Sequence, residues 1–434
     1  MSQEERRMSE LAKHIQRIRE HVLSDYHGMY RESGEALVHP FLTPGSAQYA
    51  DVLWDWDSWW SNVALRQILA EVDDADEYDR ARTYERGCIL NWIHFSHLRD
   101  HTGWMPISCA RGGPRPKPPR DLYVDNMHKP CLAQHAAFLI REDGGDAQWL
   151  REGFYPIQCF VNNYRNHHRD RWSGLYYWQN ENAIGVDDDP CTYGRPPRSS
   201  ASIYLNCFMV KELEATVYLC EQLNLDEVAT QYQQDRDRLV EAINEHCWDE
   251  WLGFYYSVDL SRRDVGLGDT WVSHSGYPRD WPGLIQRIGV WSGFLGLWAG
   301  VASEDQARRV VEEHYKNDAT FRAPFGVRTL SRMEKMYNLK ASGNPSTWRG
   351  PIWGISNYMV FSGLVRYGFD DEARELAEKT VTLFGRDLER YGALHEYYQP
   401  ENGEPILNPG FQNWNYLVLN MIAWLEGKQP VREF

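Results

Sequence analysis

The sequence predicts an all-α protein built as an (α/α)6 barrel of six helical hairpins. Segments that are apolar around most of their circumference alternate along the chain with segments that carry a charged face. A helix that is apolar all round is buried, whereas one with a charged face lies outside, so about twelve helices would alternate between an inner and an outer ring. Runs of β-branched residues with a period of two are scarce, which disfavours a parallel sheet. An irregular α-bundle or an open solenoid is the alternative.

Outer helices are expected wherever a small or polar residue followed by acids marks a helix start. Asp and Ser suit the N-cap, and acids in the first turn oppose the helix dipole. Such starts recur at Asp76, Asp146, Asp226, Ser303 and Asp370. The N-terminal segment also has apolar residues at helical spacing, namely Leu11, Ile15, Ile18 and Val22.

Inner helices are expected in the aromatic and apolar segments that begin near Trp56, Ser202, Ile352 and Phe411. The loops before inner helices are long and rich in Gly, Pro and Trp, as in 103–120, 172–198 and 262–283. Long loops at one end of a regular barrel are where a site is built. No Ser/Gly-rich linker divides the chain, so residues 1–434 are expected to form a single domain.

Composition narrows the class of partner. The chain of 434 residues has a formal net charge of −16, which argues against nucleic acid because phosphates need clustered Lys and Arg. It carries 19 Trp, 25 Tyr and 15 Phe, more rings than packing requires. Flat rings with one polar handle suit a sugar-binding cleft, although Trp also fills cores. The expected partner is therefore a small sugar; the oligomeric state stays open.

Cysteine usage and the N-terminal segment indicate the compartment. The eight cysteines form no CxxC pair, which excludes a zinc ribbon, and scattered thiols suit a reducing compartment. The N-terminus is charged throughout and lacks the apolar stretch of a signal peptide. The most apolar stretch, near 290–302, is too short to span a bilayer. We expect a cytoplasmic protein that does not bind membranes.

Two acidic stretches combine carboxylates with aromatic residues. In 54–60 (WDWDSWW), Asp57 is placed to accept sugar hydroxyls while a Trp packs on the ring; the alternative is a simple N-cap. In 181–190, Asp187, Asp188 and Asp189 are adjacent, so at least one needs a proton, a cation or an Arg partner. A carboxyl kept protonated near neutrality is what a general acid requires. A solvated turn or a calcium loop is the alternative, and the EF-hand spacing is absent.

Two further stretches lie nearer the C-terminus. His395-Glu396-Tyr397-Tyr398 offers a carboxylate that could activate water, and 348–353 (WRGPIW) brings backbone and two indoles together at the first turn of a predicted inner helix. All these stretches fall at starts of inner helices or in the loops at that end.

These motifs resemble, in order and spacing, the family 63 glycoside hydrolases and the related family 37 trehalases. The resemblance is carried by WDWDSWW, GVDDDP, TWRGPIWGISNY and HEYYQPENGEPILNPGFQNWNY, and the nearest group is the short bacterial branch with mannosylglycerate and glucosylglycerate hydrolases. It implies an (α/α)6 barrel and an inverting glycosidase acting on a small α-glucoside or α-mannoside, without metal or organic cofactor. The family's general acid falls on Asp187 and its general base on Glu396.

The resemblance also implies a set of sugar contacts. Trp56 and Asp57 correspond to the element that holds the nonreducing sugar, and the same motifs supply Trp348, Arg349, Trp353, Gln412 and Trp414. The chain departs from the pattern at Val186, where the family has Trp beside the acid, and at the additional Asp188 and Asp189, so either of these remains an alternative acid.

A basic loop bears on the rest of the substrate. Residues 110–120 carry four basic residues and no acid, among them Arg111 and Arg115. Such a loop beside an acidic site favours a substrate with a carboxylate or phosphate, such as a glycoside of glycerate. The alternatives are a solvated loop without substrate contact, or recognition of the acid by Arg195 and Arg198, which lie near Asp187 in the sequence. Two other functions remain open: a sugar epimerase or isomerase, for which the His167-His168 pair is the candidate base, and a non-catalytic sugar-binding relative. We expect that histidine pair to be the solvated end of an outer helix.

Overall fold

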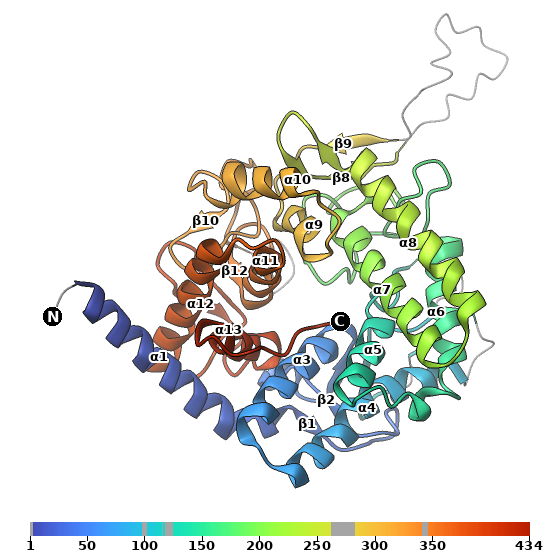
Figure 1. The fold of residues 1–434 in the computed structure, drawn as a ribbon, viewed down its shortest axis with the longest axis horizontal. Helices are drawn as coiled ribbons and strands as arrows, with labels where there is room; N and C mark the ends of the chain where they lie inside the picture. The colour runs from blue at the N-terminus through green and yellow to red at the C-terminus, as the bar shows by residue number, and fades with distance from the viewer. Residues whose placement is uncertain (1–2, 98–101, 115, 118–124, 262–282, 341–345) are drawn as a thin grey trace, which may run out of the picture.

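The computed structural model describes residues 3–97, 102–114, 116–117, 125–261, 283–340 and 346–434. Within these residues the helices form two concentric rings (Figure 1). The inner ring consists of α3 (Asp55–Val72), α5 (Leu132–Glu142), α7 (Ile203–Gln222), α9 (Leu295–Trp298), α11 (Gly354–Arg366) and α13 (Val418–Leu425). The outer ring consists of α1 (Gln3–Asp25), α4 (Ala75–His97), α6 (Phe154–His167), α8 (Asp226–His246), α10 (Glu304–Arg309) and α12 (Asp370–Tyr391). The predicted (α/α)6 barrel is therefore confirmed.

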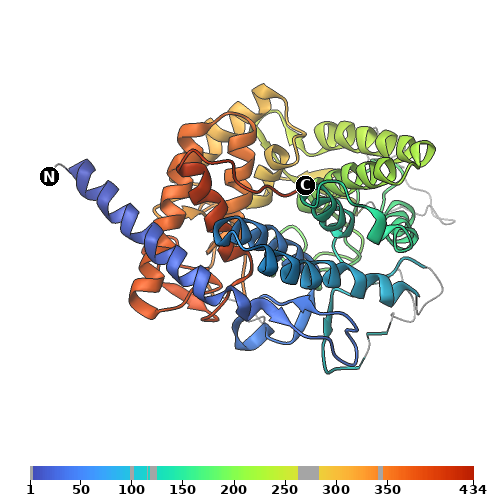
Figure 2. The same cartoon turned by 60° about the horizontal axis from the view of Figure 1, so that its bottom comes forward.

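Burial follows the predicted division between the rings. Helices α3, α7 and α11 are buried along almost their whole length, including their polar residues, because they face other helices on all sides. Helix α12 begins at Asp370 with three acids in its first turn and buries one face only. Ser303 caps α10 through a reciprocal bond with Gln306. Helix α1 packs along α12, and its N-terminal part projects beyond the ring (Figure 2).

The prediction that a helix begins at Asp146 is wrong. Asp146 is followed by a single 3₁₀ turn, η2 (Gln148–Leu150), and α6 begins only at Phe154. The carboxylate of Asp146 accepts the N–H of Gln148, which closes a local turn in place of a helical cap. The π turn η4 (Val310–Tyr315) extends α10, and η1 (Tyr26–Met29), η3 (Trp291–Phe294), η5 (Asn413–Leu417) and the short α2 (Ser46–Tyr49) lie in connections.

Short antiparallel strands join the loops at the N-terminal ends of the inner helices. The pairs are β1 (Tyr30–Arg31) with β2 (Phe41–Leu42), β3 (Val52–Trp54) with β4 (Ser108–Ala110), β6 (Trp248–Asp249) with β7 (Phe254–Tyr255), and β10 (Arg322–Ala323) with β11 (Gly326–Val327). Three-stranded ribbons join β5 (Ser200–Ala201), β8 (Ser257–Asp259) and β9 (Leu284–Gln286), and also β12 (Ile352–Trp353), β13 (Tyr397–Tyr398) and β14 (Pro405–Leu407).

Three of these strands lead directly into inner helices and so orient their first turns. Strand β3 ends where α3 begins, β5 ends one residue before α7, and β12 ends where α11 begins. In this last case Pro351 precedes the strand, so the expectation that the Gly-Pro pair occupies the first helical turn is wrong. Each of these strands ends at the rim of the barrel, where the inner helix that follows it begins. The last side chains of the strand therefore lie at the N-terminus of that helix.

The opposite end of the barrel is filled by the C-terminal segment, which lies at the centre of the ring in Figure 1. The buried carboxylate of Glu433 accepts hydrogen bonds from the Trp298 indole (2.8 Å), the Tyr358 hydroxyl (2.7 Å) and the Ser362 hydroxyl (2.8 Å). These donors belong to α9 and α11. Among the described residues, no helix combines the length and the apolar character that crossing a bilayer requires.

Candidate active site

The loop that precedes β5 carries the three adjacent aspartates, and the structure turns them in different directions. Asp187 accepts a hydrogen bond from the Ser346 hydroxyl, and its backbone carbonyl accepts the N–H of Trp348 (3.0 Å). Asp188 has φ +63° and lies 3.6 Å from the guanidinium of Arg349. These two carboxylates thus have different partners, a hydroxyl and a guanidinium, which offset the repulsion between adjacent acids.

Asp189 is the most confined of the three. Its side chain is buried and accepts the N–H of Cys191 at 2.8 Å. Burial raises the pKa of Asp189 to about 6, while the bond from Cys191 acts in the opposite direction. This bond holds the turn that contains Asp189. Of the three aspartates, Asp187 is the one whose charge acts on Glu396.

Glu396 lies just before β13 and is almost completely buried. The Tyr49 hydroxyl donates to Oε1 at 3.0 Å, and the Asn408 amide donates to Oε2. Burial raises the pKa of Glu396 to about 7; the bonds from Asn408 and Tyr49 lower it, and the charge of Asp187 raises it further. A carboxylate with a pKa near neutrality has the right strength for a general base at neutral pH.

The segment around Glu396 is held from behind by Asp387 of α12. Its buried carboxylate accepts the backbone N–H of His395 (3.0 Å), the imidazole Nδ1 of the same residue (3.0 Å) and the Tyr398 hydroxyl (2.7 Å). The Asn415 amide donates to the His395 carbonyl at 2.7 Å. The residues that flank Glu396 are therefore attached to the helices behind them.

The first turn of α3 supplies Trp56 and Asp57. Asp57 accepts the Asn413 amide at 2.7 Å, and Asn413 is itself oriented by the Ser61 hydroxyl (3.1 Å). Burial, together with the charges of Asp55 and Glu396, raises the pKa of Asp57 to about 8 against the opposing effect of Lys129. Glu396 therefore interacts electrostatically with the first turn of α3.

The acid-bearing loop approaches α3 through a glycine. Gly185 has φ +85°, and a Cβ there would lie 2.3 Å from Cε of Lys129 and 3.2 Å from the Trp56 ring. Only glycine permits this approach. The N-cap position of α3 is Trp54, so neither Asp55 nor Asp57 is the N-cap that the alternative interpretation of WDWDSWW expected. The Asp55 carboxylate accepts the Trp56 N–H at 2.7 Å and pairs with Lys129.

Four aromatic rings form a continuous stack at the same end of the barrel. Trp348 stacks on Trp353 with ring centroids 4.2 Å apart, and Trp353 stacks on Tyr397 at 4.8 Å. Trp291 extends the stack on the other side of Trp348 at 5.6 Å. The register of β12 and β13, which sets Trp353 opposite Tyr397, produces the contact between these two rings.

The remaining predicted aromatic residues join this stack. The Trp56 ring lies 5.1 Å from Trp414 and 6.2 Å from Trp348. Trp414 also lies 6.1 Å from Trp353. The structure therefore gathers Trp56, Asp57, Asp187, Trp348, Trp353, Glu396 and Trp414 from distant parts of the chain.

Two predicted contact residues are engaged elsewhere. The Gln412 amide donates to the backbone carbonyl and the carboxylate of Asp25, so its nitrogen anchors the end of α1. The Arg349 guanidinium donates to the Lys340 carbonyl (2.9 Å) and faces Asp188.

Of the basic loop, Arg111 is described and Arg115 lies outside the described residues. Arg111 pairs with Asp51 at 3.1 Å, and its backbone N–H donates to the Asp51 carbonyl at 2.8 Å. Arg31 approaches the same carboxylate at 3.5 Å. Two guanidinium groups thus flank one acid, two residues after Tyr49.

The histidine pair is not solvated as predicted. His167 ends α6 half-buried, but His168 is buried against Tyr164, with ring centroids 4.7 Å apart. Burial lowers the pKa of His168 to about 3, so its imidazole is neutral at ordinary pH. His168 therefore belongs to the packed interior next to Tyr164.

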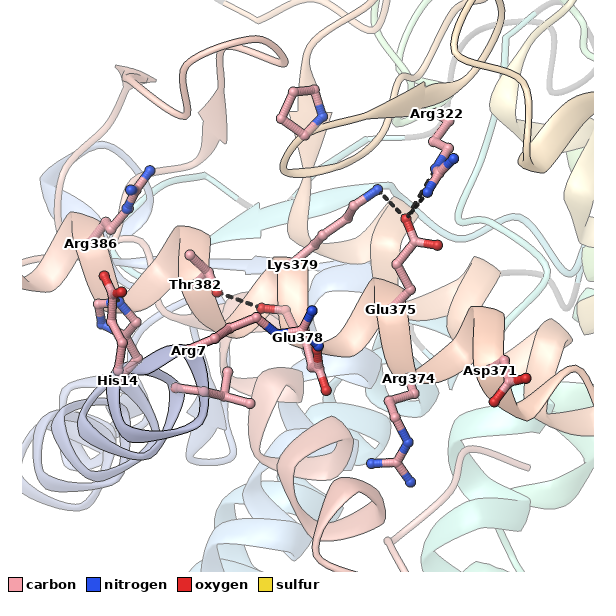
Figure 3. A pocket seen from close by; sticks show the side chains of 13 residues that line it. Arg7, His14, Arg322, Asp371, Arg374, Glu375, Glu378, Lys379, Thr382 and Arg386 are labelled. Atoms are coloured by element: carbon pink, nitrogen blue, oxygen red, sulfur yellow. Dashed lines mark hydrogen bonds and ion pairs between the residues drawn. The ribbon is translucent and has the colours of Figure 1, made fainter. Parts of the chain in front are cut away.

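The structure also has a polar groove of about 600 Å³ between α1 and α12 (Figure 3). Its lining includes Arg7, which pairs with Glu378 (2.7 Å), and Glu375, which pairs with Arg322 (2.9 Å) and Lys379 (2.6 Å). None of its lining residues belongs to the site described above. The groove's acids and bases largely neutralise one another.

Several residues of the site carry no individual signal in the sequence. Tyr49 ends the short helix α2, outside the motifs discussed above, and Lys129 and Asp387 become neighbours of the site only through folding. Asn408 and Asn413 fall within the long C-terminal motif. There the Asn-Pro-Gly sequence at 408–410 indicates a turn.

Comparison with known proteins identifies the family of the chain and its fold. A family model described as the mannosylglycerate hydrolase MGH1-like glycoside hydrolase domain matches residues 50–415. A probable mannosyl-oligosaccharide glucosidase of Schizosaccharomyces pombe is 24% identical over a region that covers 70% of this chain and 34% of that protein. The chain thus spans about a third of the length of this relative.

Solved structures share the fold. A crystal structure of a family 63 mannosylglycerate hydrolase from Thermus thermophilus in complex with glucose has a TM-score of 0.65 and 20% identity, covering 90% of this chain and 96% of the other. A crystal structure of the Thermus enzyme in complex with Tris and D-glycerate has the same TM-score and 18% identity, covering 94% of this chain and 100% of the other.

Proposed function

The chain belongs to the mannosylglycerate hydrolase MGH1-like glycoside hydrolases, and from that premise we propose that it is an inverting α-glycosidase that cleaves a small α-glucoside or α-mannoside. The observation that carries this proposal is the placement of two carboxyl groups beside one aromatic stack: the Asp187 backbone carbonyl accepts the Trp348 N–H, and Glu396 directly precedes Tyr397 at one end of the stack. Each is held by its own set of hydrogen bonds on a separate loop, and the charge of one raises the pKa of the other. Two coupled carboxyl groups are what glycoside hydrolysis requires.

In this mechanism Asp187 is the general acid and Glu396 the general base. Asp187 protonates the glycosidic oxygen as the bond to the anomeric carbon breaks. Glu396 takes a proton from a water that attacks the opposite face of the sugar, so the product has the inverted, β configuration. Such a reaction needs carboxyl groups about 6.5–9.5 Å apart, which leaves room for the water.

The sugar would be held by α3 and the aromatic stack. Asp57 offers a carboxyl to sugar hydroxyls, and Trp56, next to it in the first turn of α3, offers an apolar ring for the sugar face. Both faces of Trp348 and of Trp353 are covered by neighbouring rings of the stack, so these two residues would meet the sugar only along their edges. Hydrogen bonds orient Glu396, and its pKa lies near neutrality. The proposed mechanism uses no metal or organic cofactor. General acid–base catalysis of this kind contributes about 10²–10⁴-fold to the rate.

For the leaving group we propose a small acid such as glycerate. Arg31 and Arg111 flank Asp51, two residues after Tyr49, whose hydroxyl contacts Glu396, and guanidinium groups bind carboxylates through charge-assisted bonds. The Thermus enzyme of the same fold is a mannosylglycerate hydrolase solved with D-glycerate, which supports this choice. Eight free cysteines favour a reducing compartment, and we place the enzyme in the cytoplasm.

A hydrolysis screen tests the proposal. The purified chain is incubated with glucosylglycerate, mannosylglycerate, trehalose, kojibiose and maltose, and proton NMR follows the anomeric signals from the first minutes. We expect release of the β anomer, fastest from a glycerate glycoside. First release of the α anomer would imply a retaining nucleophile, and formation of a ketose or epimer would point to the isomerase class. No turnover of any glycoside would overturn the proposal.

A further inference from the structure

Both carboxylate oxygens of Glu396 are engaged by donors from two segments that are far apart in the chain. The Tyr49 hydroxyl donates to Oε1 at 3.0 Å, and the Asn408 amide donates to Oε2. The Asn408 nitrogen also lies 3.4 Å from the Tyr49 hydroxyl oxygen. The two donors and the carboxylate therefore form one closed polar cluster.

The Tyr49 phenol is rigidly placed. Its ring packs edge-on against Trp54, with centroids 6.0 Å apart, and against Phe411, at 5.9 Å. Its carbonyl accepts the Thr43 hydroxyl at 2.6 Å. The loop that carries α2 is attached to the C-terminal motif, since the Ser46 N–H donates to the Gly410 carbonyl at 2.8 Å. The hydroxyl can therefore reach Glu396 without losing side-chain freedom when substrate binds.

Asn408 is held just as firmly by its backbone. It has φ +49°, in the left-handed region that Asn tolerates better than most residues, and it precedes Pro409. It directly follows β14, whose residue Leu407 accepts the backbone N–H of Glu396 at 2.9 Å. One strand pairing thus fixes both the base and one of its donors.

The charged surroundings of Glu396 oppose its ionisation. Burial raises its pKa, Asp187 on the acid loop raises it further, and Asp57 on α3 is coupled to it as well. Tyr397 on β13 also feels its charge and is neutral. Among the groups that act on Glu396, the hydrogen bonds of Asn408 and Tyr49 favour the ionised form. Burial raises the pKa of Tyr49 far above its ordinary range, so its hydroxyl stays a donor.

We propose that Tyr49 and Asn408 are positioning residues that keep Glu396 ionised and direct its remaining lone pairs toward the attacking water. This inference rests on the proposed function, because it assigns Glu396 the role of base. Each oxygen of a carboxylate can accept two hydrogen bonds. With one accepted bond on each oxygen already used, the lone pair left for the water has a defined direction.

Tyr49→Phe is the direct test, because it removes the hydroxyl and keeps the ring that packs on Trp54 and Phe411. Loss of a hydrogen bond to a charged group should raise the pKa of Glu396 by about one to two pH units. The base acts only when ionised, so the acidic limb of the kcat/KM profile should move to higher pH. At a pH below the acidic limbs of both the wild type and the variant, kcat/KM should fall about ten- to hundredfold. Above the shifted limb the loss should be much smaller, and KM should be unchanged.

Tyr30→Phe is the matched control. The Tyr30 hydroxyl donates to the carboxylate of Glu77 at 3.0 Å, the same distance as in the Tyr49 pair, but between β1 and α4. It should lower the thermal midpoint similarly and leave the pH profile unchanged. Asn408→Asp keeps the side-chain shape and replaces the donor by an acceptor, so it should move the limb at least as far as Tyr49→Phe.

A readout that needs no turnover separates this inference from the proposed function. The infrared carboxylate signal of Glu396, obtained as the difference between each protein and its Glu396→Gln counterpart, is titrated from pH 4 to 9. A higher midpoint in Tyr49→Phe and in Asn408→Asp supports the inference even where the screen finds no substrate. An unchanged midpoint, a uniform loss of kcat at all pH values, or an effect on KM alone would overturn it.

Discussion

Lys129 and Asp55 form a buried ion pair beneath Trp56, in which Nζ lies 2.8 Å from each carboxylate oxygen of Asp55. The backbone N–H of Lys129 adds a bond to the same carboxylate at 2.9 Å. Gly185 of the acid-bearing loop packs on the Lys129 side chain. The pair therefore joins the first turn of α3 to the loop that carries Asp187.

Lys129→Met should destabilise the fold by about 3–5 kcal/mol, because it leaves the Asp55 carboxylate buried without its cation. The double variant Asp55→Asn/Lys129→Met should recover part of this loss, since neither charge then remains. Thermal unfolding of the wild type, the two single variants and the double variant measures the effect. A double variant less stable than Lys129→Met would contradict this account of the pair.

Asp187→Asn and Glu396→Gln should each lower kcat by about 10²–10⁴-fold while the protein stays folded and binds sugar. Each substitution removes the proton transfer and keeps the side-chain shape. Initial rates on the best substrate of the screen measure the loss, and circular dichroism reports the fold. Asp188→Asn is the control, because its carboxylate faces Arg349. A greater loss in Asp188→Asn than in Asp187→Asn would assign the acid to Asp188.

Arg111→Ala should raise the KM for glycerate glycosides and leave trehalose hydrolysis unchanged. A charge-assisted hydrogen bond to a carboxylate contributes about 1.5–3 kcal/mol, which corresponds to about a ten- to hundredfold effect. Arg115→Ala is the companion variant in the same loop. Arg308→Ala, an exposed arginine paired with Asp305 on outer helix α10, is the control. Equal changes for anionic and neutral substrates would argue against recognition of the acid by this loop.

Asp57→Asn should change how stability depends on pH. The pKa of Asp57 rises from its ordinary 3.8 to about 8 on folding, so the native state retains a proton that the unfolded chain has released. The contribution of this group to stability is present below about pH 4 and is lost as the pH rises through about 8. Asn cannot ionise, so relative to the wild type the variant should be more stable at pH 9 than at pH 5. Thermal midpoints at the two values decide this, and parallel curves would count against the raised pKa.

Local sequence pattern was sufficient for most helices and for the main site motifs. Ser303 and Asp370 mark true helix starts because capping and dipole interactions act within one turn. Asp146 was misread because the same carboxylate closes a local turn when the next helix begins eight residues later. The buried state of His168 was also missed, since a polar dipeptide at a helix end does not reveal what packs over it.

The sequence by itself determined the alternation of inner and outer helices and the motifs that carry Trp56, Asp57, Asp187 and Glu396, because these follow from hydrophobic period and from residue types at short range. Only the tertiary structure decided how those side chains are used. Strand pairing brings Trp353 onto Tyr397, and α2 brings the Tyr49 hydroxyl to Glu396 across 347 positions of the chain. Burial and neighbouring charge then raise the pKa of Glu396 to about 7 and that of Asp57 to about 8. Such shifts depend on three-dimensional distance and on exclusion of water, which linear spacing does not encode.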